Sequence, residues 1–405
     1  MARLESGIAP LRVVFVRETI PGVTPTDPDW LLYSDEIASI GNWSPNSNLA
    51  ARTKVGDPNV QGFSIGAEDH ELTVSYMLQK WLTPRDAIMD AFLRLPSNGC
   101  LPFHHSLWIR QTLPSFTGAS TGPLRIHTYA KGGLFDTASL TGDPSNSEPI
   151  LVEGTYRFQK IRSYAVSIRG VPDTLTVVST SPNDTTQTLV VEAEAAVVSE
   201  TFVLNGTTPV VGAVTFANID TFALDLEAEG DIIITYTVGL EEAVRILGSA
   251  NQQDIEGDLG IPSFGAGSFE APLNTPFEHV LGDVVVRSSD SELDANLMTI
   301  AFNVANNIQV DPIVTQKGKV LSEGNSDVTA NVTVFSEQGS HDAIIEHLKA
   351  NAANLDWDLT QGNIVLSGSV LTSVGARTYE KGAATMRRDN IFTGLSFAVT
   401  EEGGG

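Results

Sequence analysis

The chain has 405 residues and a mass of 43.2 kDa, which is room for roughly two to four domains. Its 24 Lys and Arg against 49 Asp and Glu give a formal net charge of −25, which argues against a protein that clamps nucleic acid or docks on anionic lipid. A single cysteine, Cys100, excludes an internal disulfide and a cysteine-based zinc site, and no apolar run is long enough to span a membrane.

The excess of carboxylates with few lysines has two interpretations. Self-repulsion between carboxylates keeps a protein soluble and is screened by salt, so this composition suits a halophile as well as an ordinary acidic protein. A surface that must not stick to DNA is compatible with both.

Alternation of apolar and polar residues dominates the chain and predicts a mainly β protein. The predicted strands cover residues 72–78, 124–129, 164–169, 175–179, 188–192, 202–204, 232–238, 284–287, 298–304, 328–334, 364–367 and 395–399.

Helical periodicity is rare. Residues 84–93 are predicted as a helix with Thr83 as N-cap and Pro84 at the first position. Residues 340–349 are predicted as a second helix that Ser340 caps, and residues 240–247 as a weaker third.

A stretch of strand followed by helix occurs twice, 256 residues apart. The offset superposes residues 72–78 on 328–334 and residues 86–90 on 342–346 without a gap. Any two strand–helix units look partly alike, but the shared Asp-Ala-Ile at Asp86 and Asp342 favours a tandem duplication. Two polar stretches, 42–62 and 306–325, precede the repeated strand in each copy and are predicted as long loops that reach a neighbour.

The region between the copies differs from them in composition and in the spacing of its predicted strands. Residues 172–238 contain predicted strands separated by Asn-, Gly- and Asp-rich turns, and no His, Lys or Arg. This spacing is typical of a small sandwich and predicts an inserted immunoglobulin-like module. The expected domains are therefore residues 1–171, 172–239 and 240–405.

No catalytic, cofactor-binding or metal-binding residue is predicted. His104 and His105 are adjacent, so on a strand their side chains point to opposite sides and do not chelate together. Asp342 and Glu346 are expected to lie on a solvated helix face, and Cys100 to be inert. The glycines at 265 and 267 lack the context of a phosphate loop. The five tryptophans (Trp30, Trp43, Trp81, Trp108 and Trp357) are expected in core or interface packing.

The pattern resembles the tail tube proteins of long-tailed viruses. The residues that carry the resemblance are the segment 18–25, the strands from residue 63 to residue 78, the helix 84–93 and the second copy at 328–348. The resemblance implies two tandem tube-type β-sandwich or barrel domains, each with a short flanking helix, and an immunoglobulin-like module decorating the outside. The low lysine content suggests a virus of a haloarchaeon.

The resemblance further implies a structural virion protein without cofactor or membrane contact. Three duplicated chains would close into a pseudo-sixfold ring, and stacked rings would form the tube, assembled in the host cytoplasm with tail terminator, tail tip and tape measure proteins. Viral DNA would pass through the lumen without specific binding, and we expect an inner wall that is net acidic.

Two other function classes remain open. A β-protein on a virion or cell surface could bind a receptor or glycan through exposed aromatic and Asn side chains. An enzyme with a site near His104 and His105 is the third hypothesis, which a bound metal in stoichiometric amount would favour.

Overall fold

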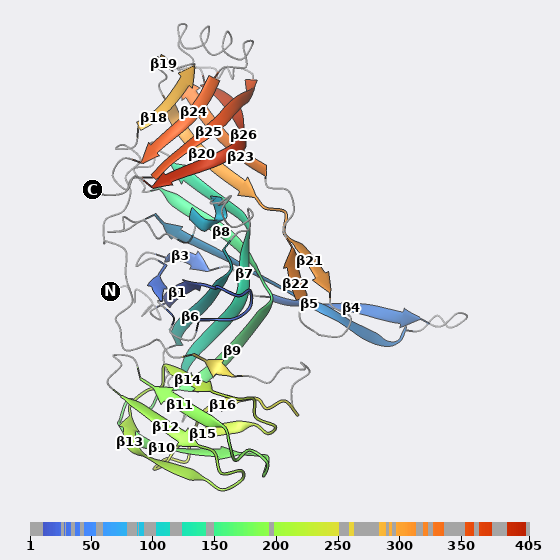
Figure 1. The fold of residues 1–405 in the computed structure, drawn as a ribbon, viewed down its shortest axis with the longest axis vertical. Helices are drawn as coiled ribbons and strands as arrows, with labels where there is room; N and C mark the ends of the chain where they lie inside the picture. The colour runs from blue at the N-terminus through green and yellow to red at the C-terminus, as the bar shows by residue number, and fades with distance from the viewer. Residues whose placement is uncertain are drawn as a thin grey trace, which may run out of the picture.

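The protein is mainly β, as the alternation predicts, and its strands form several antiparallel sheets in the computed structural model (Figure 1). Within residues 11–401, the structure describes all but 26–27, 29, 34–36, 41–43, 54–59, 79–86, 88, 93–102, 114–123, 143–149, 194–197, 251–258, 263–282, 289–290, 294–296, 313–318, 323–326, 336–352, 360–363 and 375–386. In the described part, no helix has the length and apolarity needed to cross a membrane.

The largest sheet has 16 strands and takes strands from both ends of the chain. Its N-terminal strands are β1 (Leu11–Arg17), β2 (Leu31–Leu32), β3 (Ile37–Ile40), β4 (Ser44–Thr53), β5 (Val60–Met77), β6 (His105–Leu113), β7 (Leu124–Gly142), β8 (Leu151–Phe158) and β9 (Lys160–Ser167). Its C-terminal strands are β18 (Asp283–Ser288), β19 (Ser291–Leu293), β20 (Leu297–Ala305), β23 (Asp327–Phe335), β24 (Ala353–Leu359), β25 (Ile364–Val374) and β26 (Arg387–Glu401).

The two series of strands have the same neighbour order. The N-terminal series runs β2-β1-β6-β7-β8-β5-β3, and the C-terminal series runs β19-β18-β24-β25-β26-β23-β20. In chain order, the strands β1, β2, β3, β5, β6, β7 and β8 correspond to β18, β19, β20, β23, β24, β25 and β26. Replacing each strand of the N-terminal series by its counterpart gives the order of the C-terminal series. Seven strands thus repeat both their sequence order and their pairing.

The 256-residue offset assigns corresponding positions in the two series. Ile40 of β3 pairs with Val74, and Phe302 of β20 pairs with Ala330. The offset superposes Val74 on Ala330, so Ile40 and Phe302 occupy corresponding positions.

A tryptophan marks the same place in both series. Trp108 on β6 lies opposite Val14 of β1, and Trp357 on β24 lies opposite Val284 of β18. An arginine follows each of these valines by three residues, Arg17 in β1 and Arg287 in β18.

Both polar stretches contain β-hairpins, so their prediction as loops was wrong. β4 pairs with the first part of β5 and projects sideways from the sheet (Figure 1), while β21 (Gln309–Pro312) pairs with β22 (Lys319–Ser322). Backbone hydrogen bonds hold these strands together, and they do not depend on an apolar side-chain pattern.

Two four-stranded sheets lie between the two series in sequence. One has the order β13-β10-β15-β16 and the other β12-β11-β14-β17. Their strands are β10 (Asp173–Ser179), β11 (Thr188–Glu192), β12 (Ser199–Val203), β13 (Val210–Phe216), β14 (Thr221–Leu224), β15 (Ile232–Tyr236), β16 (Glu242–Ile246) and β17 (Gly260–Ile261). We call residues 173–261 the two-sheet unit; it extends past residue 239.

The weak helix prediction for residues 240–247 was wrong. These residues include β16, which pairs with β15 and places Ile246 opposite Ile232. Ala243, Val244 and Ile246 are buried, so tertiary burial and strand pairing outweigh the local preference.

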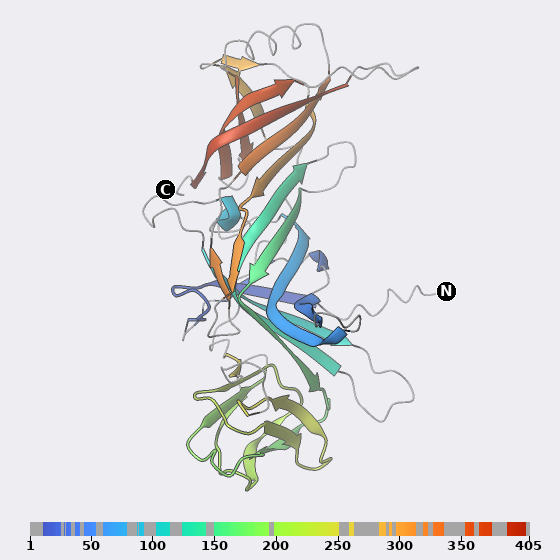
Figure 2. The ribbon, with the colours of Figure 1, turned by 90° about the vertical axis from the view of Figure 1, so that its right-hand side faces the viewer.

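One hydrophobic core runs from the main sheet into the two-sheet unit. It joins Trp108 and Tyr164 of the main sheet to Phe222 and Tyr236 of the unit, and the Tyr164 and Phe222 rings meet edge to face with centroids 5.0 Å apart. The unit therefore lies directly on one end of the main sheet, as Figure 2 shows, and is not tethered at a distance.

The other predicted strands are found, but several are much longer than predicted: β5 begins already at Val60, β7 runs on to Gly142, β25 runs on to Val374, and β26 begins at Arg387. Within the first predicted helix, the structure describes Ala87 in a turn and the single helical turn α1 (Met89–Phe92). The second predicted helix, residues 340–349, lies outside the described residues, as do Cys100 and the glycines at 265 and 267.

Candidate functional site

The two series meet where β20 pairs with the second half of β7. Phe302 lies opposite Leu140 and Val304 opposite Ala138, and all four side chains are buried. Six residue pairs join the strands, so the C-terminal series continues the N-terminal sheet edge to edge. We call this contact the in-chain junction.

Asn306 fixes the end of the in-chain junction. Its side-chain amide donates to the carbonyl oxygen of Phe135 at 2.9 Å, and its backbone N–H donates to that of Asp136 at 2.7 Å. The Asp136 carboxylate accepts from the backbone of Ile308 at 2.9 Å and from Arg157 at 2.8 Å.

Beyond this point, the hairpin of β21 and β22 lies on the N-terminal series. Ile308, Leu321 and Val310 form a small cluster with Leu134 of β7. The in-chain junction thus combines backbone pairing, a buried asparagine and an apolar contact under a hairpin.

In the part of the chain that the structure describes, the strands that correspond to the two sides of this junction have free edges. Among the described residues, β3 pairs with β5 alone, whereas the corresponding β20 pairs with both β23 and β7. β25 corresponds to β7. Among the described residues, 371–374 of β25 pair with β26 alone, whereas the second half of β7 pairs with both β8 and β20. Such edges are templates for another strand.

His105 lies in a buried polar network and not in an open site. It is fully buried, and its Nε2 lies 2.7 Å from Asp90 Oδ2, while Arg17 contributes two hydrogen bonds of 2.6 and 2.8 Å to the same carboxylate. The Tyr156 hydroxyl lies 3.3 Å from His105 Nδ1. The network ties α1 to β1, β6 and β8.

The neighbouring His104 is not part of this network. Burial lowers its pKa below the ordinary value, against the opposing attraction of Glu18. Among the described residues, no group of three or more His, Cys, Asp or Glu side chains is arranged to hold a metal ion.

A second charged cluster joins the main sheet to the two-sheet unit. Asp220, 1% exposed, forms ion pairs with Arg110 of β6, at 3.2 Å, and with Arg125 of β7. Burial lowers the pKa of Arg110 to about 10 and raises that of Asp220, in each case against the attraction of the partner. Burying these charges costs free energy of desolvation, which their mutual attraction offsets. Removing one partner therefore leaves a buried charge without compensation.

His127 lies beside these arginines as a neutral ring. It stacks on Trp108, whose Nε1 donates to His127 Nδ1 at 3.1 Å. Burial, with the nearby charges of Arg110 and Arg125, lowers the pKa of His127 to about 3. The sequence analysis did not predict this cluster, because Asp220 lies 110 residues from Arg110 and 95 residues from Arg125 in the chain.

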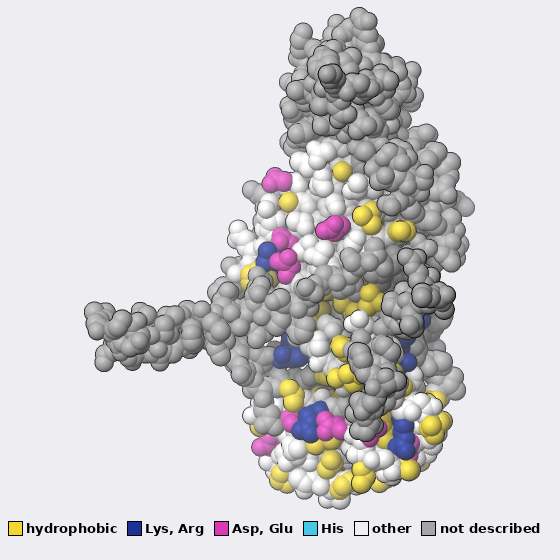
Figure 3. All heavy atoms as spheres, turned by 180° about the vertical axis from the view of Figure 1, so that it is seen from behind, with side chains coloured by type: hydrophobic (Ala, Val, Ile, Leu, Met, Phe, Trp, Pro, Cys, Tyr) yellow, Lys and Arg dark blue, Asp and Glu magenta, His cyan; other side chains and the backbone are white. Residues whose placement is uncertain are grey.

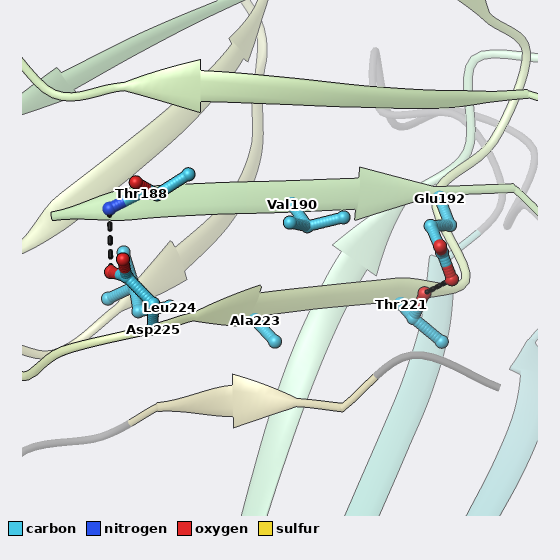
Figure 4. A pocket seen from close by; sticks show the side chains of 7 residues that line it. All are labelled: Thr188, Val190, Glu192, Thr221, Ala223, Leu224 and Asp225. Atoms are coloured by element: carbon cyan, nitrogen blue, oxygen red, sulfur yellow. Dashed lines mark hydrogen bonds between the residues drawn. The ribbon is translucent and has the colours of Figure 1, made fainter. Parts of the chain in front are cut away.

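A shallow groove of about 280 Å³ lies on the sheet that contains β11 and β14 (Figure 4). Val190 and Ala223 lie side by side in it, and carboxylates stand at its two ends. Glu192 accepts from Thr221 Oγ1, and Asp225 accepts from the backbone of Thr188, so both carboxylates already have partners within the protein.

The surface drawn in Figure 3 has no concentrated basic patch among the described residues, because its Lys and Arg side chains lie at separate places. Trp30 and Trp108 are buried in the core, whereas Trp43 and Trp81 lie outside the described residues.

No protein-family model matches the chain, and no curated protein matches its sequence.

Replacing Asp220 by Ala leaves the buried Arg110 and the half-buried Arg125 without their carboxylate. We expect a loss of about 3–5 kcal/mol in unfolding free energy, measured by chemical denaturation. The control is Asp225→Ala, because Asp225 is exposed, and its loss should stay below about 1 kcal/mol. Equal losses in the two variants would contradict a special role for Asp220.

Acid should destabilise the fold through His127. The pKa of His127 is lowered from 6.5 to about 3 in the folded protein, so its contribution to stability is fully present above pH 6.5. As the pH falls from 6.5 toward 3, the unfolded chain takes up a proton at this residue and the contribution is lost. Relative to His127→Gln, the wild type should lose about 3 kcal/mol between pH 7 and pH 4. Parallel pH profiles of unfolding free energy for the two proteins would contradict this.

Proposed function

We propose that the chain is a non-enzymatic structural subunit that assembles with copies of itself into the tail tube of a long-tailed virus. The observation that carries the proposal is the in-chain junction together with the free edges of β3 and β25. In strand order, β3 corresponds to β20 and β25 corresponds to β7. The two free edges therefore match the two sides of the in-chain junction.

Repeating the in-chain junction between chains gives one continuous sheet. β3 of one chain adds to β25 of the next, as β20 adds to β7 within a chain. A series of such contacts that closes on itself leaves neither β3 nor β25 with an open edge, which removes the risk of uncontrolled pairing there. A closed ring of duplicated domains is also the arrangement that the resemblance to tail tube proteins implies.

In this proposal the two series of strands are two tube-type domains, and the two-sheet unit is an inserted immunoglobulin-like module. The shared neighbour order supports the duplication, and the two four-stranded antiparallel sheets around one core support the module. Three chains, each with two copies, would give a pseudo-sixfold ring. Rings would stack with the help of tail terminator, tail tip and tape measure proteins.

The charge of the chain supports the same function. A protein with a formal charge of −25 repels phosphate, so DNA could pass through a tube of such subunits without being held. The acid excess also suits a virus of a haloarchaeon, whose proteins work in concentrated salt.

A second candidate is a virion or cell-surface protein that binds a receptor or glycan. The groove over β11 and β14 supports it, because an apolar floor with a few polar groups at its ends is the usual composition of a small-ligand site. Such a protein needs no polymer, so its assembly state distinguishes it from a tube subunit.

Electron microscopy of the purified protein at several salt concentrations tests the two candidates. We expect rings or stacked tubes with a central channel, favoured by high salt because repulsion between acidic chains is then screened. Each ring should show three outer projections, one for each two-sheet unit. Discrete monomers or dimers at every salt concentration would favour the binding protein.

A further inference from the structure

One edge of the two-sheet unit has the composition of an aggregation-prone strand. β13 has the sequence VVGAVTF, without a charged residue or proline, and lies at the edge of its sheet. Val211 is 60% exposed, and Val203 on the adjacent edge strand β12 is 59% exposed. Uncharged segments of high β propensity at an exposed edge readily pair with another chain.

β13 carries an irregularity in the middle of this edge. Thr215 lies opposite Thr174 and Val211 opposite Thr176, so three residues of β13 face the single residue Leu175 of β10. Such a bulge leaves backbone groups without partners in the ladder.

A carboxylate from β12 occupies the backbone groups at this bulge. Glu200 accepts from the N–H of Ala213 at 2.6 Å and from that of Val214 at 3.2 Å. A Cβ atom on Gly212 would lie 2.3 Å from Glu200 Oε2, so glycine makes room for the carboxylate. Glu200 therefore occupies two N–H groups at the bulge, where β13 has no register partner in β10.

We propose that Glu200 closes the β13 edge, and that without its carboxylate this edge pairs with the β13 edge of a second copy. Two β13 strands can meet antiparallel about Ala213, and neither brings a charge to the contact, although each chain is strongly acidic overall. The contact is independent of the ring proposed above, which uses β3 and β25.

The closed edge would restrict self-association to the edges intended for it. A protein that assembles through the edges of β3 and β25 forms one regular assembly only if its other exposed edges do not pair with further copies. Glu200 and Gly212 act together here, since one supplies the blocking group and the other the space for it.

Cross-linking of the full chain tests the proposal. The reporter is Ala213→Cys in a Cys100→Ser background, because Ala213 is exposed and lies at the centre of the expected contact. With Glu200 present, we expect little disulfide-linked dimer on non-reducing gels. Glu200→Ala should increase the dimer about tenfold, the effect of losing a charge-assisted hydrogen bond.

Gly212→Ala opens the same edge without changing Glu200, because the added methyl group displaces the carboxylate. It should increase the dimer in the same direction. Adding Val211→Lys to either variant should return the dimer to the starting level, since a lysine at an edge disfavours pairing. Glu241→Ala, which removes one carboxylate from the turn before β16, should leave the dimer unchanged.

Thermal unfolding of each variant shows whether it is folded before cross-linking. Folded Glu200→Ala and Gly212→Ala proteins without an increase in dimer would overturn the proposal. An increase that Val211→Lys does not reverse would overturn it too, as would cross-linking to unrelated chains in place of a second copy.

Discussion

The unpaired backbone groups at the edges of a β-sheet are the constraint on which this structure depends. A 16-strand sheet built from two similar series has several edge strands. Each edge can pair with another chain and cause aggregation unless it is paired, covered or blocked. The chain pairs β20 with β7 inside itself and blocks β13 with Glu200. In the described part of the chain it leaves β3 and the end of β25 free, and these are the edges that our proposed ring uses.

Buried polar contacts give the edges a fixed geometry. Asn306 and Asp136 hold the in-chain junction at the point where β20 leaves the sheet, and Asp90 holds α1 to β1 and β6. Asp220 holds the two-sheet unit against β6 and β7. Buried charge pairs are costly to desolvate, so a complete pair adds little net stability, whereas the loss of one partner is strongly destabilising. A subunit with one arrangement presents its free edges in a constant direction.

The sequence predicted the class of the fold and most strand positions, because half-buried strands alternate apolar and polar residues. It also pointed to two similar units of strands, and the two series in the main sheet do share one neighbour order. It failed for the hairpin of β4 and β5, since strands rich in Ser and Asn are held by backbone bonds and show no apolar pattern. It failed for β16 because a short apolar run can be helix or strand. The in-chain junction and the Glu200 contact were beyond its reach, since they join residues that only the folded chain brings together.

The most direct measurement concerns the proposed contact between β3 and β25. Leu140 and Val374 occupy corresponding positions, because their partners Val152 and Asn390 pair with Tyr76 and Val332, which the offset superposes. Since Phe302 lies opposite Leu140 within the chain, Ile40 should lie opposite Val374 between chains.

The test mixes an Ile40→Cys chain with a Val374→Cys chain, both in the Cys100→Ser background, and oxidises the assembled protein. We predict a disulfide-linked pair that contains one chain of each kind, and far less product when either variant is oxidised alone. Rings that assemble without this mixed pair would contradict the proposed junction.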